Sequence, residues 1–172
     1  MIDLLARAEA LAQPWADLYN DSTVLQVGVT FLHIGGFVVA GGLALAADRS
    51  TLRVAGAPAP IRGHHLAELG AVHRPVLFGL VVTFLSGVLL FGSDVATYGP
   101  SYFFWGKMAL IAGLLANGAL LSRTERRLQA AGAAVDQDWT ALRHRAVTSM
   151  ALWVSIVLVG TILPNLSNVA SR

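Results

Sequence analysis

The sequence predicts an all-α protein, a four-helix transmembrane bundle that occupies residues 1–172 as one integral membrane domain. Apolar residues gather into four blocks, and each is long enough to span a hydrocarbon core of about 30 Å at a rise of about 1.5 Å per residue. Hydrophobic residues make up 55% of the chain and charged residues 13%, with a mean hydropathy of +0.63. That leaves too little polar surface for a water-soluble globule of this length. The blocks lie at about 24–47, 66–92, 102–121 and 147–164.

The segment before the first block predicts a short amphipathic helix lying on the outer membrane surface. Leu5, Ala8 and Leu11 recur at helical spacing with charged residues between them, and Pro14 is expected to end the helix. The segment lacks the basic start and the apolar run of a cleaved signal peptide.

The polar connections between the blocks predict one loop and one helical extension. Gly56, Pro58 and Pro60 break the chain before the second block, so His64 and His65 are expected to be solvated loop residues. The stretch SRTERRLQAAG continues the helical pattern of the third block.

Charge distribution predicts an N-out, C-out topology. Nine of the chain's 12 cationic residues are arginines of the segments 48–74 and 122–147, which the positive-inside rule places in the cytoplasm. Aromatic residues at the opposite interface agree with this orientation, because Trp and Tyr are enriched there. They are Trp15, Tyr19, Tyr98, Tyr102 and Trp105.

Several classes of function are excluded by composition and motif. The net charge is +2, but the arginines sit at helix ends and form no basic face, so no nucleic-acid partner is expected. The chain has no cysteine and therefore no thiol chemistry. It also has no phosphate-binding glycine loop, no HExxH and no nucleophile elbow.

Two ionisable residues inside the apolar blocks are the candidate functional residues. His33 lies roughly 12–14 Å from the outer edge of the first block, and Lys107 lies roughly 8 Å into the third. Ionisable groups at such depths cost free energy and mark functional sites. Both residues belong to the outer half of the bilayer, and both helices run inward, so the two side chains are expected to line one site.

His33 has polar neighbours on its own face, because Gln26 and Thr30 precede it by seven and three residues. The cofactor-binding residues expected from this pattern are His33, Lys107, Gln26 and Thr30. Glycines at 28, 35 and 42 form a seam nearly opposite His33, where we expect a neighbouring helix, a second copy or a partner subunit.

Each candidate also has a structural interpretation that the residues leave open. His33 is either a histidine hydrogen-bonded to a neighbouring helix or an axial ligand of haem iron. Lys107 either extends to the headgroups, pairs with Asp94, or faces the cofactor. His73 lies too far toward the inner side to share one haem with His33, and Asn117 is expected to make an interhelical hydrogen bond.

Two segments resemble a known group of membrane proteins. FLHIGGFVVAGGLALAADRSTLR and YFFWGKMALIAGLLANGALLSRTER resemble the first and third helices of small four-helix proteins related to the HemJ type of protoporphyrinogen oxidase and the CopD-like membrane domain. The resemblance covers the first three helices. It implies haem b binding and oxidoreductase activity that involve His33, as ligand to the haem iron, and Lys107, as a catalytic residue. The third helix departs from the pattern, because Asn117 and Gly118 stand where a histidine is typical.

The leading functional hypothesis is a redox protein of the bacterial inner membrane that binds haem b. The resemblance implies a porphyrin or other hydrophobic reductant, with electrons leaving to a quinone or a partner protein. The alternative is a cofactor-free accessory subunit of a larger respiratory or photosynthetic membrane complex; a homo-oligomer is also compatible with the sequence. A copper or small-solute permease ranks last, because three methionines and no cysteine supply few soft ligands.

Overall fold

The computed structural model describes residues 2–131 and 136–170, and this part of the chain is helical with short connections. Four of the helices are long and apolar enough to cross a membrane, which confirms the predicted fold class. The helices are α1 (Ile2–Asp21), α2 (Thr23–Val54), α3 (Ala59–Ser93), α4 (Val95–Tyr98), α5 (Tyr102–Ala130) and α6 (Asp136–Ala170). The extension of the third apolar block is confirmed, since α5 continues to Ala130.

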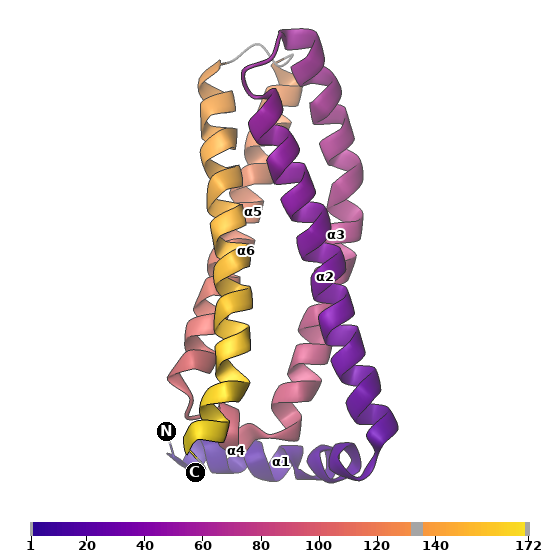
Figure 1. Ribbon diagram of the computed structural model, residues 1–172, viewed down its shortest axis with the longest axis vertical. Coiled ribbons are helices and arrows are strands. Elements are labelled where there is room, and N and C mark those ends of the chain that lie inside the picture. The colour runs from indigo at the N-terminus through magenta and orange to yellow at the C-terminus, as the bar shows by residue number, and fades with distance from the viewer. Residues whose placement is uncertain (1, 132–135, 171–172) are drawn as a thin grey trace.

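The four long helices form two hairpins, α2 with α3 and α5 with α6 (Figure 1). The hairpins approach one another at the end that holds the α2–α3 turn, which we call the arginine end. We call the opposite end, which α1 crosses, the α1 end. Toward it α2 moves away from α5 and α6, whereas the last part of α3 turns back toward α5 (Figure 1), and the rings of Phe91 and Phe104 stack there with centroids 5.0 Å apart. Hydroxyls begin two of the long helices, because Ser22 accepts from the Leu25 N–H and Ser101 from the Phe104 N–H.

The first hairpin is closed by two glycines that meet where α2 and α3 cross. A Cβ on Gly36 would lie 2.9 Å from the Gly79 carbonyl oxygen, and a Cβ on Gly79 would lie 2.8 Å from the Gly36 carbonyl oxygen. Only residues without side chains allow two helix backbones to approach this closely in a bilayer.

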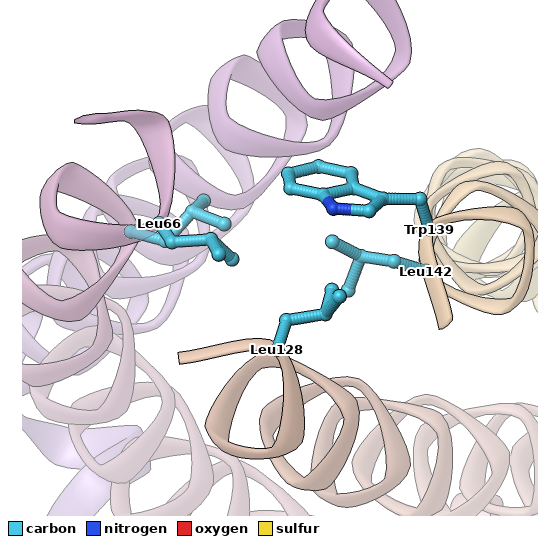
Figure 2. Close-up of a cluster of buried hydrophobic side chains, with 5 residues drawn as sticks. Leu66, Leu128, Trp139 and Leu142 are labelled. Atoms are coloured by element: carbon cyan, nitrogen blue, oxygen red, sulfur yellow. The ribbon is translucent and has the colours of Figure 1, made fainter. Parts of the chain in front are cut away.

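Two apolar clusters join the hairpins. Near mid-bundle, Trp153 of α6 packs against Gly41 of α2 and edge-on to Phe37, with ring centroids 5.1 Å apart. At the arginine end, residues from α3, α5 and α6 interdigitate (Figure 2). The second cluster consists of Leu66, Leu69, Leu128, Trp139 and Leu142.

The outer surface of the bundle is apolar rather than polar. Phe31, Phe78 and Phe84 are 72%, 70% and 69% exposed, and few residues in the most apolar windows of the four long helices are buried inside the chain. Such a surface is unfavourable in water and suited to lipid. The protein is therefore a multi-pass membrane protein.

The N-terminal helix is longer than the sequence predicted. We expected it to end at Pro14, whereas α1 continues through Pro14 to Asp21. A proline removes one backbone donor and favours a helix end, but tertiary contacts hold the second half in place. Trp15 donates its indole N–H to the Leu89 carbonyl of α3 at 2.8 Å, and its ring packs against Gly92.

The expected loop before the second block is shorter than predicted, because α3 already begins at Ala59. Pro58 occupies the cap position and Pro60 the first turn, where a proline costs no hydrogen bond. His65 is therefore a helical residue, and it is only 4% exposed, so the expectation of a solvated loop residue was wrong for it. His64 is exposed as expected, although on a helix, and it pairs with Glu68.

Candidate functional site

His33 lies on α2 and turns its ring toward α3. Its Nδ1 is 3.0 Å from the Thr83 carbonyl oxygen and 3.2 Å from the Ser86 hydroxyl. Since a carbonyl only accepts, Nδ1 carries the proton and donates it, which leaves the Nε2 lone pair exposed in the neutral ring. Gly87 makes room for the ring, because a Cβ there would lie 3.1 Å from the His33 Cε1 atom.

Lys107 lies near the start of α5, on the opposite hairpin from His33. Its ammonium nitrogen lies beside Gly160 of α6, because a Cβ added to that glycine would be 3.6 Å from the nitrogen. Among the described residues no salt bridge joins Lys107 to Asp94, whose carboxylate accepts from the Thr97 N–H.

The two polar neighbours expected beside His33 face elsewhere. Gln26 donates its amide to the carbonyls of Tyr19 and Asn20 and so binds the connection between α1 and α2. Thr30 is exposed on the surface of α2. The structure therefore places His33 against α3 and Lys107 beside α6, and neither Gln26 nor Thr30 shares these contacts.

The glycine seam expected to contact a neighbouring helix makes no close contact with the described residues of this chain. An added Cβ on Gly28, Gly35 or Gly42 meets no atom within 4 Å. The glycines that carry close helix contacts are instead Gly36 and Gly41. A contact of the seam with a second copy or a partner subunit stays a prediction. Asn117 behaves as expected, since its amide donates to the Arg145 carbonyl of α6 at 2.9 Å.

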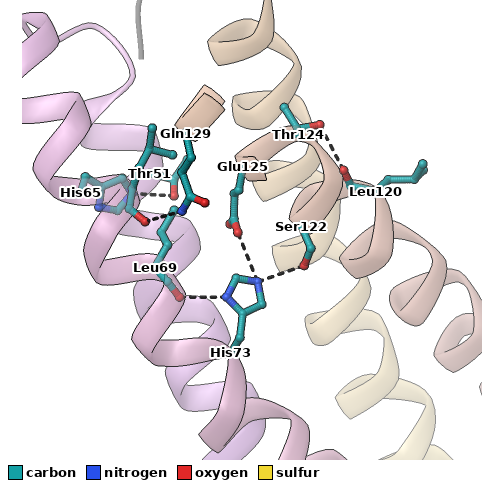
Figure 3. A network of polar contacts seen from close by, with 10 residues as sticks. Thr51, His65, Leu69, His73, Leu120, Ser122, Thr124, Glu125 and Gln129 are labelled. Carbon is teal, nitrogen blue, oxygen red and sulfur yellow. Dashed lines mark hydrogen bonds and ion pairs between the residues drawn. The ribbon is translucent and has the colours of Figure 1, made fainter. Parts of the chain in front are cut away.

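A second polar site, which was not predicted from the sequence, lies at the arginine end (Figure 3). His73 of α3 contacts Glu125 of α5 across the two hairpins, with 3.2 Å between Nε2 and Oε2. The same Nε2 lies 3.0 Å from the Ser122 hydroxyl, while Nδ1 lies 2.9 Å from the Leu69 carbonyl oxygen. Gln129 of α5 also reaches across to donate to the Leu66 carbonyl.

The contacts of His73 connect the two hairpins. Its Nδ1 donates to the Leu69 carbonyl, while its Nε2 faces both the Ser122 hydroxyl and a carboxylate oxygen of Glu125. Either a proton lies between Nε2 and Glu125, or Nε2 accepts from the Ser122 hydroxyl. In each case a hydrogen bond of His73 links α3 to α5.

Other buried polar groups surround this contact. Asp48 and Thr51 of α2 are 5% and 3% exposed, and Glu125 is 3% exposed. The Nε2 atom of His65 lies 2.9 Å from the Thr51 hydroxyl oxygen. The Ser149 hydroxyl of α6 faces Asp48. One carboxylate oxygen of Asp48 and one of Glu125 are buried without a hydrogen-bond partner in the described structure. No three His, Asp or Glu side chains of the described chain are arranged to hold a metal ion.

A periodic signal for this cluster is present in the sequence. Asp48 and Thr51 share one face of α2, and Ser122, Glu125 and Gln129 share one face of α5. These residues extend the inward faces of their helices beyond the apolar blocks. They lie outside those blocks, in the segments assigned to the cytoplasmic side, so depth in the membrane did not single them out.

The fold and the two polar sites define the class of the protein as an all-α, multi-pass membrane protein with ionisable groups inside its bundle. No family model, no curated protein and no solved structure matches the chain.

Proposed function

We propose that the protein binds haem b in the half of the bundle nearest α1, with His33 as an axial ligand of the iron, and that it acts as a redox protein. The observation that carries the proposal is the hydrogen bond from the His33 Nδ1–H to the Thr83 carbonyl. Metal-ligating histidines commonly donate one ring N–H to a backbone carbonyl, which fixes the ring and its tautomer and leaves the other nitrogen for the metal.

The donor set on the opposite hairpin fits the same group. Lys107 is the only lysine of the chain and lies on the hairpin opposite His33. Its amine would be a second ligand when neutral, and when charged it would pair with an acidic group of the cofactor. Bound haem supplies one-electron chemistry. Lys107 is thus the candidate catalytic residue, whereas Gln26 and Thr30 face away from His33 and are not part of the proposed site.

The resemblance to the HemJ type supports an oxidoreductase with a hydrophobic reductant, such as a porphyrin, and a quinone or a protein as electron acceptor. The apolar exterior lets such reactants approach from the bilayer. The bacterial inner membrane, with both termini outside, is the location that the arginine distribution favours.

The test is the reduced-minus-oxidised absorption spectrum of the detergent-purified protein. We expect a b-type signal that His33→Ala abolishes and that Lys107→Gln shifts or weakens. His64→Ala is the matched control, because His64 is exposed on the surface of α3, and its spectrum should equal that of the wild type.

Wild-type protein without a haem signal after expression with added haem would overturn the proposal. Loss of the signal in His64→Ala as well would show that the assay reports folding rather than ligation. A colourless protein that co-purifies with other chains of a respiratory or photosynthetic complex would favour the accessory-subunit alternative.

A further inference from the structure

Two acidic residues of the arginine end lie at a similar level of the bundle, on opposite hairpins. Thr51 of α2 contacts His65 of α3, and Gln129 of α5 donates to the carbonyl of the residue that follows His65 (Figure 3). Asp48 precedes Thr51 by three residues, and Glu125 precedes Gln129 by four. Both helices run toward the arginine end (Figure 1). Each acid therefore lies about one helical turn, or about 5–6 Å, nearer the α1 end than its partner beside α3.

Both acids are buried, and each has an oxygen without a hydrogen-bond partner. Asp48 is 5% exposed and Glu125 is 3% exposed. The Asp48 Oδ2 and the Glu125 Oε1 contact no donor or acceptor of the described residues. An ionised carboxylate that is buried without enough donors costs several kcal/mol, and such a group takes up a proton instead. The supply of donors is thus too small for two buried negative charges.

The cationic groups of the surrounding helices do not fill this gap. Arg126 of α5 is exposed, and Arg145 of α6 has a buried Nη1 that itself lacks a hydrogen-bond partner. On α3, His65 is bonded to a hydroxyl of α2, while His73 contacts the acid of α5. Within the described helices no salt bridge joins an arginine to either acid. His73 is therefore the ionisable group that contacts the acid pair.

We propose that Asp48 and Glu125 form a proton-binding site that retains one proton at neutral pH. The pair then carries one negative charge, which a single imidazole can balance. Because the acids belong to different hairpins, proton binding is linked to the approach of the hairpins, and unfolding releases the proton. Acidic residues and histidines inside membrane proteins commonly form proton relays. The proposal is independent of haem binding, because this cluster contacts α3 at residues 65–73 and His33 contacts α3 at Thr83.

The test is infrared absorption of the detergent-purified full chain, which separates the C=O stretch of a protonated carboxyl group from the carboxylate bands. At neutral pH the wild type should show a band equivalent to one protonated carboxyl group per chain. The double variant Asp48→Asn/Glu125→Gln, which keeps the size of both side chains, should lose this band. Glu68→Gln is the matched control, because Glu68 is exposed on α3, and it should leave the band unchanged.

Stability measured by denaturation at different pH values gives a second readout. A carboxyl group that holds its proton more tightly in the folded state stabilises the protein at low pH, and this contribution is lost as the pH rises. The wild type should therefore lose stability when the pH is raised past neutral, and the double variant should lose less.

Three results would overturn the proposal. The first is a folded wild type without the band at neutral pH, which decides the question even if the double variant does not fold. The second is a band that persists in the double variant. The third is an equal dependence of stability on pH in the two proteins.

Discussion

At the scale of single residues, the protein buries carboxylates that have few partners. Glu125 is 3% exposed and receives its side-chain contact from His73, which belongs to the other hairpin. A buried acceptor that loses its donor costs about 1–3 kcal/mol, whereas replacing both partners by apolar groups is nearly neutral. The contact therefore locks two halves of the bundle through one pair of side chains.

His73→Ala should lower the free energy of unfolding by about 1–3 kcal/mol, because it leaves the Glu125 carboxylate buried without its donor. The double variant His73→Ala/Glu125→Leu should recover most of this loss. Tryptophan fluorescence during detergent denaturation measures both. His64→Ala, which breaks an exposed pair with Glu68, should cost no more than about 0.5 kcal/mol. A double variant less stable than His73→Ala alone would contradict this account.

At the scale of helices, the crossing of α2 and α3 depends on two glycines that face each other. A side chain on either glycine would meet backbone atoms of the partner helix at 2.8–3.1 Å, among them the carbonyl oxygens and the Ala40 nitrogen. Backbone atoms cannot turn away as a flexible side chain can, so the helices themselves would have to separate.

Gly79→Ala should therefore destabilise the protein by about 1–3 kcal/mol, the usual cost of overpacking. Gly28→Ala and Gly42→Ala are the matched controls, because nothing lies within 4 Å of the added Cβ. These two should be neutral or up to about 1 kcal/mol more stable, since alanine favours the helix. Equal destabilisation by all three variants would refute the assignment of the close contact to Gly79.

The helices themselves were predictable from the sequence, but their contacts were not. Length and apolar composition identify the four spans, because the bilayer demands about 20 apolar residues for each. The spacing of glycines in one helix does not say which seam meets a neighbour, and the regular seam at Gly28 proved to face away from the bundle. The predicted end of α1 at Pro14 was wrong, since the anchoring bond from Trp15 comes from a distant helix.

The two polar sites also differ in how far the sequence predicts them. Depth in the apolar blocks singled out His33 and Lys107, and the structure places His33 against α3 and Lys107 beside Gly160 of α6. The cluster around Glu125 was missed, because polar residues at helix ends look solvated until a second hairpin covers them. Burial of this kind depends on tertiary packing that the sequence of one helix does not contain.

At the scale of the whole molecule, the protein has two different ends. Trp15, Trp105 and the other belt aromatics gather at the α1 end, and Trp105 is fixed there by a bond from its indole to the Gly99 carbonyl. The opposite end carries the α2–α3 turn and most of the arginines. This asymmetry is the basis of the proposed orientation.

The orientation can be tested with single cysteines, because the natural chain has none. Ala96→Cys on α4 should react with a membrane-impermeant maleimide in intact cells. Gly56→Cys, in the α2–α3 turn, should react only after the membrane is permeabilised. The reverse pattern would invert the predicted topology, and equal labelling of both would show mixed insertion.

The helix ends nearest the two termini, Ile2 of α1 and Ala170 of α6, lie at the same end of the bundle (Figure 1). A peptide linker could therefore join them without crossing the bilayer, and the chain could be reopened at the turn between α2 and α3. Such a circular permutant keeps the same four spans, but it begins and ends at the arginine end. In the predicted orientation neither terminus of the permutant would have to cross the membrane. The permutant would show whether the bundle forms when its helices follow in another order along the chain.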